Sequence, residues 1–339
     1  MSEPIPVPGW YAAMIGPPCV SHEDSVAGRL PRAARAFPRA PAPVRGALLW
    51  LATRRAPLVA LIRNAPGTAA FLALEGLRPG GRRVVLLEFI GRPPARRAPL
   101  RLAGALRARL EGLALRRCLA AAQVLTAAEA QRYPAELGLP RGLFHTVPWP
   151  LSRTGGKLPP EPPPSRRVVS SGRAYCDWDT LLAAARGRDW DLTLICSEGE
   201  EATLRRRAAG AARVAAELPR EEHDALLREA AVYALVLHPT SVSAGQVRLA
   251  AAVDSGIAVV ATDVPALEGY ASPESALLVP PSDPVALGDA VDRLLADPAE
   301  RRRLREAARA RGRTWTYDEY FAAVGDLLAA AAAQTTGTP

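Results

Sequence analysis

Lysine is nearly absent from this 339-residue chain: Lys157 is the only one, and the other 42 basic residues are arginines. Aromatic residues are also few, at 5 % of the sequence, so the arginines have few neighbouring rings on which nucleobases stack. Abundant alanine and 33 prolines accompany the arginines, which indicates a GC-rich coding bias. The net charge of +9 and the pI near 10.0 therefore do not indicate a nucleic-acid site, and we expect no nucleic-acid partner.

Paired metal-ligand spacings, a leader segment and long apolar runs are missing as well. None of Cys19, Cys118, Cys176 and Cys196 belongs to a Cys-x-x-Cys or a comparable spacing. No basic and apolar leader opens the chain, and no apolar run approaches the roughly 20 residues that a membrane span needs. We expect a cytoplasmic protein with reduced thiols and no bound metal.

Hydrophobic residues make up 49 % of the sequence, which is ample for two buried cores. From Gly46 onward, apolar strand-like runs alternate with helical patterns, and this alternation predicts an α/β fold with parallel sheets. Proline, glycine and small residues mark the boundaries. The expected parts are an irregular arm (1–45), a Rossmann-like domain (46–153), a linker (154–165), a second Rossmann-like domain (166–312) and a C-terminal segment (313–339).

One βαβ pattern indicates a binding site. Residues 235–263 read LVLHPTSVSAGQVRLAAAVDSGIAVVATD: a strand, a small-residue loop that opens a helix, and a second strand. Unpaired N–H groups at such a helix start suit a pyrophosphate, and Gly245 lets an anion approach the backbone. Gly256 is the expected C-cap of the helix. Doubly wound domains contain several such turns without a ligand, so a purely structural role stays open.

The residues that follow carry a family resemblance. Ala-Thr-Asp at 261–263, Leu-Val-Pro-Pro-Ser-Asp-Pro at 278–284, Asp297-Pro298, an arginine-rich helix and a final aromatic helix resemble the closing stretch of a GT-B glycosyltransferase of the family 4 type. With VVSSGRAYCDWDTLLAAA and DLTLICS upstream, the resemblance covers about residues 120–325. It implies two Rossmann-like domains whose parallel sheets face a cleft. The first (46–153) would bind the acceptor and the second (166–312) the donor, and a C-terminal helix (313–339) would return toward the first.

The chain departs from this family at its glutamate motif. Family 4 retaining enzymes carry two glutamates across the loop and helix described above, and those positions hold Ser243 and Ala251. A lysine that usually follows Gly-Arg is replaced by Asp179, and the strand and glycine-rich loop with which family members begin are absent. Ser-Ala-Gly-Gln at 243–246 resembles a variant subgroup. Three functions stay open: an active transferase, a binding or partner protein that lost turnover, and a sugar-nucleotide epimerase.

The expected donor site needs positive charge where the diphosphate leaves. Arg173 is the first candidate and Arg248 the second, because arginine grips phosphate with a planar fork. For Arg248, a solvated helix position is the alternative. Ser243 and Gln246 are expected to bind sugar hydroxyls. The other expected donor-side residues are Gly172, Leu218, His238, Ala244, Gly245 and Glu268.

On the acceptor side, Glu88 ends an apolar strand and is the candidate general base, a role that requires a raised pKa. Asn64 and Thr68 share the same edge, where turn-forming and capping roles are the alternatives. Asp177 and Asp179 form an Asp-x-Asp that we expect to cap a helix rather than bind metal.

We thus expect metal-independent transfer of a hexosyl or related group from a nucleotide-diphosphate sugar, with retention implied by the family and no cofactor. The acceptor, a small molecule, glycan or lipid-linked molecule, is not identified. Arg96 to Arg117 combines leucines at helical spacing with arginines, so peripheral contact with the inner membrane face stays open. A homodimer also stays open.

Overall fold

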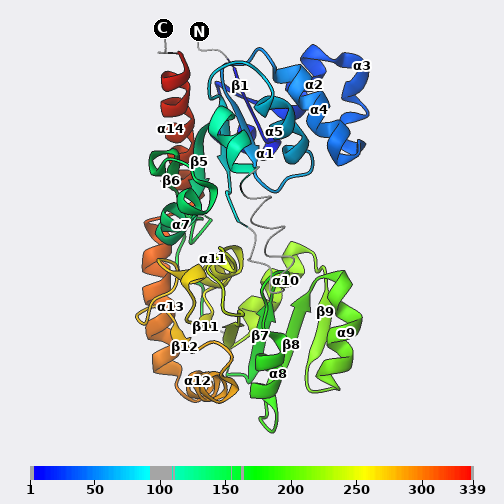
Figure 1. Cartoon of the computed structure of the whole chain (residues 1–339). Coiled ribbons are helices and arrows are strands. Elements are labelled where there is room, and N and C mark those ends of the chain that lie inside the picture. Colours follow the sequence, from blue (N-terminus) through cyan, green and yellow to red (C-terminus); the bar gives the residue numbers. More distant parts are fainter. Residues whose placement is uncertain (1–3, 92–108, 110, 154, 162–163, 337–339) are drawn as a thin grey trace. The chain divides into compact units, whose positions relative to one another are not determined.

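The structure is a computed structural model that describes residues 4–91, 109, 111–153, 155–161 and 164–336 (Figure 1). The chain divides into two compact units: unit 1 comprises the chain up to Pro148 together with the C-terminal residues from Tyr320, and unit 2 comprises Trp149–Glu319. Each unit contains a parallel sheet with helices, so the predicted α/β fold is confirmed. Most of the predicted basic amphipathic segment Arg96 to Arg117 lies outside the described residues.

Unit 1 is built on a four-stranded parallel sheet in the order β3-β4-β5-β6, and a parallel pair of strands lies beside β3. Strands β3, β4 and β5 are mostly buried and almost wholly apolar, as expected of strands covered on both faces. The edge strand β6 is exposed at His145 and Thr146. The strands are β1 (Ile5–Val7), β2 (Cys19–Ser21), β3 (Val59–Ile62), β4 (Val84–Leu87), β5 (Leu119–Val124) and β6 (Phe144–Thr146). The helices are α1 (Gly9–Ile15), α2 (His22–Arg29), α3 (Pro31–Ala34), η1 (Phe37–Arg39), α4 (Ala42–Thr53), α5 (Thr68–Gly76), α7 (Ala127–Leu137) and η2 (Arg141–Leu143), with residues 111–118 also helical.

The irregular arm predicted for residues 1–45 is wrong, because this segment holds β1, β2 and three α-helices. The same finding corrects the expectation that an opening strand is absent. Tyr11, Val26 and Phe37 from this segment are buried in unit 1. The prolines misled the sequence interpretation because several of them occupy the first turns of short helices, where a missing N–H costs nothing.

Unit 2 is built on a six-stranded parallel sheet in the order β12-β11-β10-β7-β8-β9. Successive residues of β7 face opposite cores: Val168 packs with α8, α9 and α12, whereas Val169 packs with α10 and α11. The strands are β7 (Arg167–Ser171), β8 (Asp191–Cys196), β9 (Arg213–Ala216), β10 (Val232–Leu235), β11 (Ala258–Thr262) and β12 (Leu277–Val279). The helices are α8 (Trp178–Ala185), α9 (Glu198–Ala208), α10 (Arg220–Glu229), α11 (Gln246–Ser255), η3 (Pro265–Leu267), α12 (Pro284–Ala296) and α13 (Pro298–Arg313).

The strand order of unit 2 reverses between β7 and β10. From β7 the chain builds outward through β8 and β9, and then returns to place β10, β11 and β12 on the other side. In open parallel sheets, ligands bind at such a switch point, outside the carboxyl ends of the strands. The topology therefore predicts a ligand site at the loops that follow β7 and β10.

Three buried arginines on one face of α13 hold the described part of the predicted linker. Arg309 donates from Nε to the carbonyl of Gly156 at 2.7 Å, and Arg305 donates from Nη2 to the carbonyls of Pro159 at 2.9 Å and Pro160 at 3.1 Å. Arg301, one turn earlier, donates to Glu161 at 3.3 Å. Because these contacts fix the backbone of 155–161, this stretch is part of unit 2 rather than a free tether.

The C-terminal helix α14 (Tyr317–Thr336) contributes aromatic side chains to unit 1. The hydroxyl of Tyr320 lies 2.7 Å from that of Tyr11, and the Phe321 ring packs edge-on against those of Trp10 and Tyr11. None of the helices in the described part of the chain combines the length and the apolar character required to cross a membrane.

Candidate functional site

The two loops at the switch point of unit 2 lie against each other. The loop after β7 carries Gly172 to Cys176, and the loop after β10 leads to Gly245. Cys176 and Leu237 form an isolated antiparallel bridge, and the N–H of His238 donates to the carbonyl of Tyr175 at 2.8 Å. A Cβ at Gly172 would lie 2.2 Å from Cys176 Sγ, so the two ends of the first loop approach each other closely at this turn. The loops therefore form one surface at the carboxyl ends of β7 and β10.

The start of α11 contributes backbone donors to this surface. Gly245 is the N-cap residue and has a φ of 85°, a left-handed conformation that glycine adopts without strain. The first N–H groups of a helix have no partner within it, and they attract anions. Ser243 and Ala244 are buried just before this turn. The predicted glycine C-cap of α11 is confirmed at Gly256, whose φ is 65°.

The side chain of Gln246, which was predicted to bind a sugar hydroxyl, is engaged in a structural hydrogen bond. Its Nε2 donates to the carbonyl of Ala266 at 2.7 Å, and the residue is 4 % exposed. The amide thus holds the loop after β11 against α11 instead of presenting its N–H to a sugar hydroxyl.

Arg173, the first candidate for the diphosphate cation, has an acidic partner. Its guanidinium forms an ion pair with Glu217, and its side chain is 63 % exposed. Glu217 lies in the loop after β9. Its φ of 47° is a left-handed backbone conformation that is strained for residues other than glycine. The positive charge of Arg173 is therefore largely neutralised in the structure.

Arg248, the second candidate, is half-buried and forms no ion pair with any described residue. Its Nη1 lies 3.3 Å from Nε2 of the buried His223. Because a guanidinium N–H can only donate, Nε2 accepts, and the ring proton sits on Nδ1, which lies 3.6 Å from Asp224 Oδ1. Burial, reinforced by the charge of Arg248, lowers the pKa of His223, so the ring is neutral near pH 7. The interpretation of Arg248 as a solvated surface residue does not fit these contacts.

Ser171 and Tyr233 complete the hydrogen bonds beneath Arg248. Ser171 Oγ lies 3.0 Å from His223 Nε2 and 2.9 Å from the Tyr233 hydroxyl. Ser171 directly precedes Gly172 at the end of β7. His223, which the sequence interpretation overlooked, thus connects Arg248 with the switch-point strand.

The Asp-x-Asp pair and the remaining expected donor-side residues lie in segments that follow β7, β9, β10 and β11. Asp177 caps α8 by accepting from the N–H and the hydroxyl of Thr180 at 3.1 and 2.8 Å, which confirms its predicted capping role. Asp179 forms an ion pair with Arg207 at 3.1 Å. His238 Nδ1 lies 3.4 Å from Asp177 Oδ2. Leu218 packs partly buried against the α10–α11 side of the sheet, and Glu268 is exposed after η3.

Glu88 occupies the corresponding strand end in unit 1. It follows β4 with a φ of 47°, its N–H donates to Gln123 Oε1 at 2.7 Å, and its Oε1 accepts from the Tyr11 hydroxyl at 3.0 Å. Burial raises the pKa of Glu88, although the hydrogen bond from Tyr11 opposes the shift. A raised pKa is what a carboxylate base near neutral pH requires.

Asn64 and Thr68 are occupied by structural contacts. Asn64 Nδ2 donates to the carbonyl of Ile90 at 3.0 Å, and its Oδ1 accepts from Arg63 at 3.2 Å. The buried Thr68 donates its hydroxyl to the carbonyl of Ile62 at 2.8 Å. These contacts favour the turn-forming alternative over direct acceptor contact.

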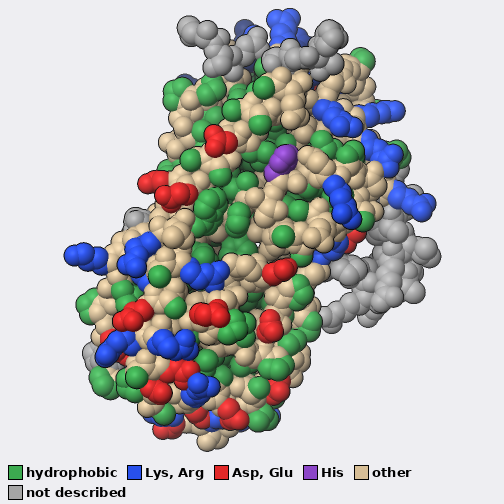
Figure 2. Space-filling model, turned by 90° about the vertical axis from the view of Figure 1, so that its left-hand side faces the viewer, with side chains coloured by type: hydrophobic (Ala, Val, Ile, Leu, Met, Phe, Trp, Pro, Cys, Tyr) green, Lys and Arg blue, Asp and Glu red, His purple; other side chains and the backbone are tan. Residues whose placement is uncertain are grey.

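The visible surface of unit 2 carries mixed charge. In the lower part of Figure 2, arginine side chains are interspersed with aspartate and glutamate.

Comparisons with known proteins fit this geometry. Residues 177–297, about a third of the chain, match the family model described as Glycosyl transferases group 1. No curated protein matches the chain significantly. Among solved structures, the chain is similar to a glycosyltransferase from Rickettsia africae, with 9 % identity, 100 % of both chains covered and a TM-score of 0.65.

Two further structures resemble the chain over most of its length. Anabaena Alr3699/HepE in complex with UDP has 12 % identity, covers 97 % of this chain and 100 % of its own, and gives a TM-score of 0.65. Sucrose-phosphate synthase from Thermosynechococcus elongatus has 21 % identity, covers 93 % and 81 %, and gives a TM-score of 0.61. At these identities the likeness shows the fold. The chain has a GT-B fold, and residues 177–297 match the glycosyltransferase group 1 model; both findings support the prediction of a glycosyltransferase.

Proposed function

We propose that the protein transfers a sugar from a nucleotide-diphosphate sugar to an acceptor, without a metal ion and with retention of configuration. The observation that carries the proposal is Arg248, a half-buried cation without an acidic partner among the described residues, on the helix that starts at the switch point. Anabaena Alr3699/HepE, a structure of similar fold, has been solved with UDP and with UDP-glucose, which supports a uridine donor as the first to test.

In this proposal, the guanidinium of Arg248 and the first N–H groups of α11 stabilise the negative charge that develops on the departing diphosphate. Preorganised donors of this kind stabilise a transition state most when they lie away from bulk water. Arg248 meets that condition because His223 fixes it and the fold half-buries it. Asp177 and Asp179 are engaged in a helix cap and an ion pair, so the proposal assigns them no metal. Retention rests on the family resemblance.

We extend the proposal to a cytoplasmic enzyme, because all four cysteines are free thiols, as is usual in a reducing compartment.

The proposal is tested by titrating UDP into the protein by calorimetry and by following UDP release from UDP-glucose. Saturable UDP binding with slow release of UDP supports the transferase. Binding without release on any acceptor identifies a binding protein that lost turnover, and conversion of the donor sugar without an acceptor identifies an epimerase. Absence of heat with UDP, GDP and dTDP would contradict the proposal.

Removing the partner of Arg173 should strengthen donor binding. With Glu217→Gln, the guanidinium of Arg173 is released to the diphosphate, and because the pair is exposed we expect only a roughly two- to fivefold gain in UDP affinity. Calorimetry measures the gain, and Glu221→Gln on α10 is a control with the same change of net charge. Unchanged or weaker UDP binding in Glu217→Gln would show that Arg173 takes no part.

Glu88 is proposed as the base that accepts the proton of the acceptor hydroxyl. Glu88→Gln should lower turnover by roughly 10²- to 10⁴-fold while UDP binding in unit 2 is unchanged.

A base works when deprotonated, so kcat/KM should fall as the pH drops through the raised pKa of Glu88. Tyr11→Phe removes the bond that lowers this pKa, so the acid limb should move to higher pH. A pH profile unchanged by Tyr11→Phe would exclude Glu88 as the titrating base.

A further inference from the structure

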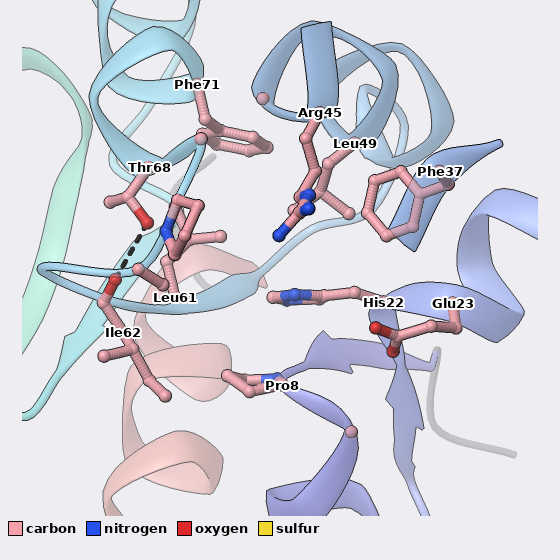
Figure 3. Close-up of a pocket in the computed structure, with 15 residues that line it drawn as sticks. Pro8, His22, Glu23, Phe37, Arg45, Leu49, Leu61, Ile62, Thr68 and Phe71 are labelled. Carbon is pink, nitrogen blue, oxygen red and sulfur yellow. Dashed lines mark hydrogen bonds between the residues drawn. The ribbon is translucent and has the colours of Figure 1, made fainter. Parts of the chain in front are cut away.

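Unit 1 contains a cavity of about 160 Å³ that the proposed donor chemistry does not use. We call it the unit 1 pocket. It is lined by the loop after β1, the first residues of α2, the start of α4 and the loop between β3 and α5, which all meet at the carboxyl ends of β1, β2 and β3 (Figure 3). The side chains in its lining include His22, Glu23, Phe37, Arg45, Leu49 and Phe71.

Arg45 supplies hydrogen-bond donors to this pocket. Its Nη2 donates to the carbonyls of Pro38 and Ala40, which anchors the side chain. Its Nε is buried and has no hydrogen-bond partner among the described residues, so the N–H groups left for a ligand are those at the end of the guanidinium. Figure 3 shows the guanidinium pointing toward the ring of His22.

His22 and Glu23 supply acceptors. His22 Nε2 lies 2.8 Å from the carbonyl of Ala60, which can only accept, so Nε2 carries the proton. Burial lowers the pKa of His22 to about 4, so the ring is neutral at neutral pH and Nδ1 keeps a lone pair. Neither Glu23 nor Arg45 forms an ion pair with another residue in the described part of the chain. The pocket therefore offers hydrogen-bond donors from Arg45 and acceptors from His22 and Glu23, and none of the ion pairs among the described residues involves Arg45 or Glu23.

Apolar side chains form the rest of the wall. Phe37, Leu49, Leu61 and Phe71 are buried and line the pocket. A cavity of about 150 Å³ accommodates a benzene ring, so this one has the size of a single six-membered ring. A ring that fits must present hydroxyl groups to Arg45, His22 and Glu23 and a C–H face to the phenylalanines.

A pyranose has these properties, and we propose that the unit 1 pocket binds one pyranose ring. The inference rests on the proposed function insofar as the ring belongs to the acceptor. A free monosaccharide would offer the same chemistry, and the experiment separates the two sources.

The probes are the methyl glycosides of glucose, galactose and mannose, titrated into the full chain by ligand-observed NMR and calorimetry. We expect saturable binding of at least one glycoside. Glu23→Gln removes the charge of an acceptor group, and Ala65→Phe fills the rim of the pocket. Each variant should weaken glycoside binding by about tenfold or more. Arg32→Gln, a change at an exposed residue of α3 away from the pocket, should leave it unchanged.

UDP binding, measured on the same variants, should be unaffected, so that failure of the pocket and failure of the donor site are distinguishable. With UDP-glucose present, transfer to the bound glycoside assigns the pocket to the acceptor, whereas saturable binding without transfer assigns it to a free sugar. Either result supports the pocket. Absence of binding by all three glycosides, or binding that is equal in Glu23→Gln, Ala65→Phe and the unaltered protein, would overturn it.

Discussion

Replacing Arg248 with methionine should weaken UDP binding by roughly 10- to 100-fold. Methionine retains most of the side-chain length and apolar volume but removes the charge, and hydrogen bonds between a cation and phosphate contribute about 1.5–3 kcal/mol each. The loss should be large because the guanidinium is half-buried and the described residues offer it no competing carboxylate. Calorimetric titration of UDP into both proteins measures the change.

Arg173→Met is the matched control for this prediction. Arg173 is exposed and already paired with Glu217, so its removal should cost less UDP affinity than removal of Arg248. Circular dichroism and thermal unfolding establish that both variants are folded. A larger loss in Arg173→Met than in Arg248→Met would reverse the roles assigned to the two arginines.

Replacing Asp254 with alanine should destabilise the protein by about 3–5 kcal/mol. Asp254 lies near the end of α11 and accepts from Ser152 Oγ at 2.6 Å, from Arg153 Nε at 3.1 Å and from Arg309 Nη1 at 2.8 Å. The side chains of Asp254 and Arg309 are 8 % and 5 % exposed. Removing the carboxylate leaves the charge of Arg309 buried without its partner, which is far more costly than the net contribution of the pair.

Urea unfolding gives the free energy of unfolding for this comparison. The double variant Asp254→Leu/Arg309→Met removes both charges, so it should be less destabilised than Asp254→Ala. Asp191→Ala, which breaks an exposed ion pair with Arg167, should cost no more than about 1 kcal/mol. Equal losses in Asp254→Ala and Asp191→Ala would show that the buried cluster does not stabilise unit 2.

Local sequence patterns predicted the parallel sheets well. The helix after Gly245 and the strand β11 were predictable, because strand burial and glycine caps follow from residues that are neighbours in the sequence. The strand before them was predicted too late, since β10 ends at Leu235, where the predicted strand begins. The start of unit 1 was not predictable in this way. Its strands have only three residues each, and proline at the first turn of a helix is indistinguishable in composition from proline in a loop.

The side-chain partners at the site were beyond sequence interpretation for a different reason. The contacting pairs are far apart in the sequence: 44 residues separate Arg173 from Glu217, 25 separate His223 from Arg248, and 77 separate Tyr11 from Glu88. The spacing of apolar residues along helices and strands does not predict contacts between residues so far apart in the sequence. The residues expected at the donor site therefore came from the motif and the family resemblance, whereas the choice between Arg173 and Arg248 required the structure.

A crystal structure of the chain with UDP tests the central claim most directly. We expect diphosphate oxygens within hydrogen-bond distance of the Arg248 guanidinium and of the N–H groups at the start of α11, with the His223 ring still accepting from Arg248. A diphosphate bound away from the ends of β7 and β10, or held by Arg173 with Arg248 turned aside, would contradict it.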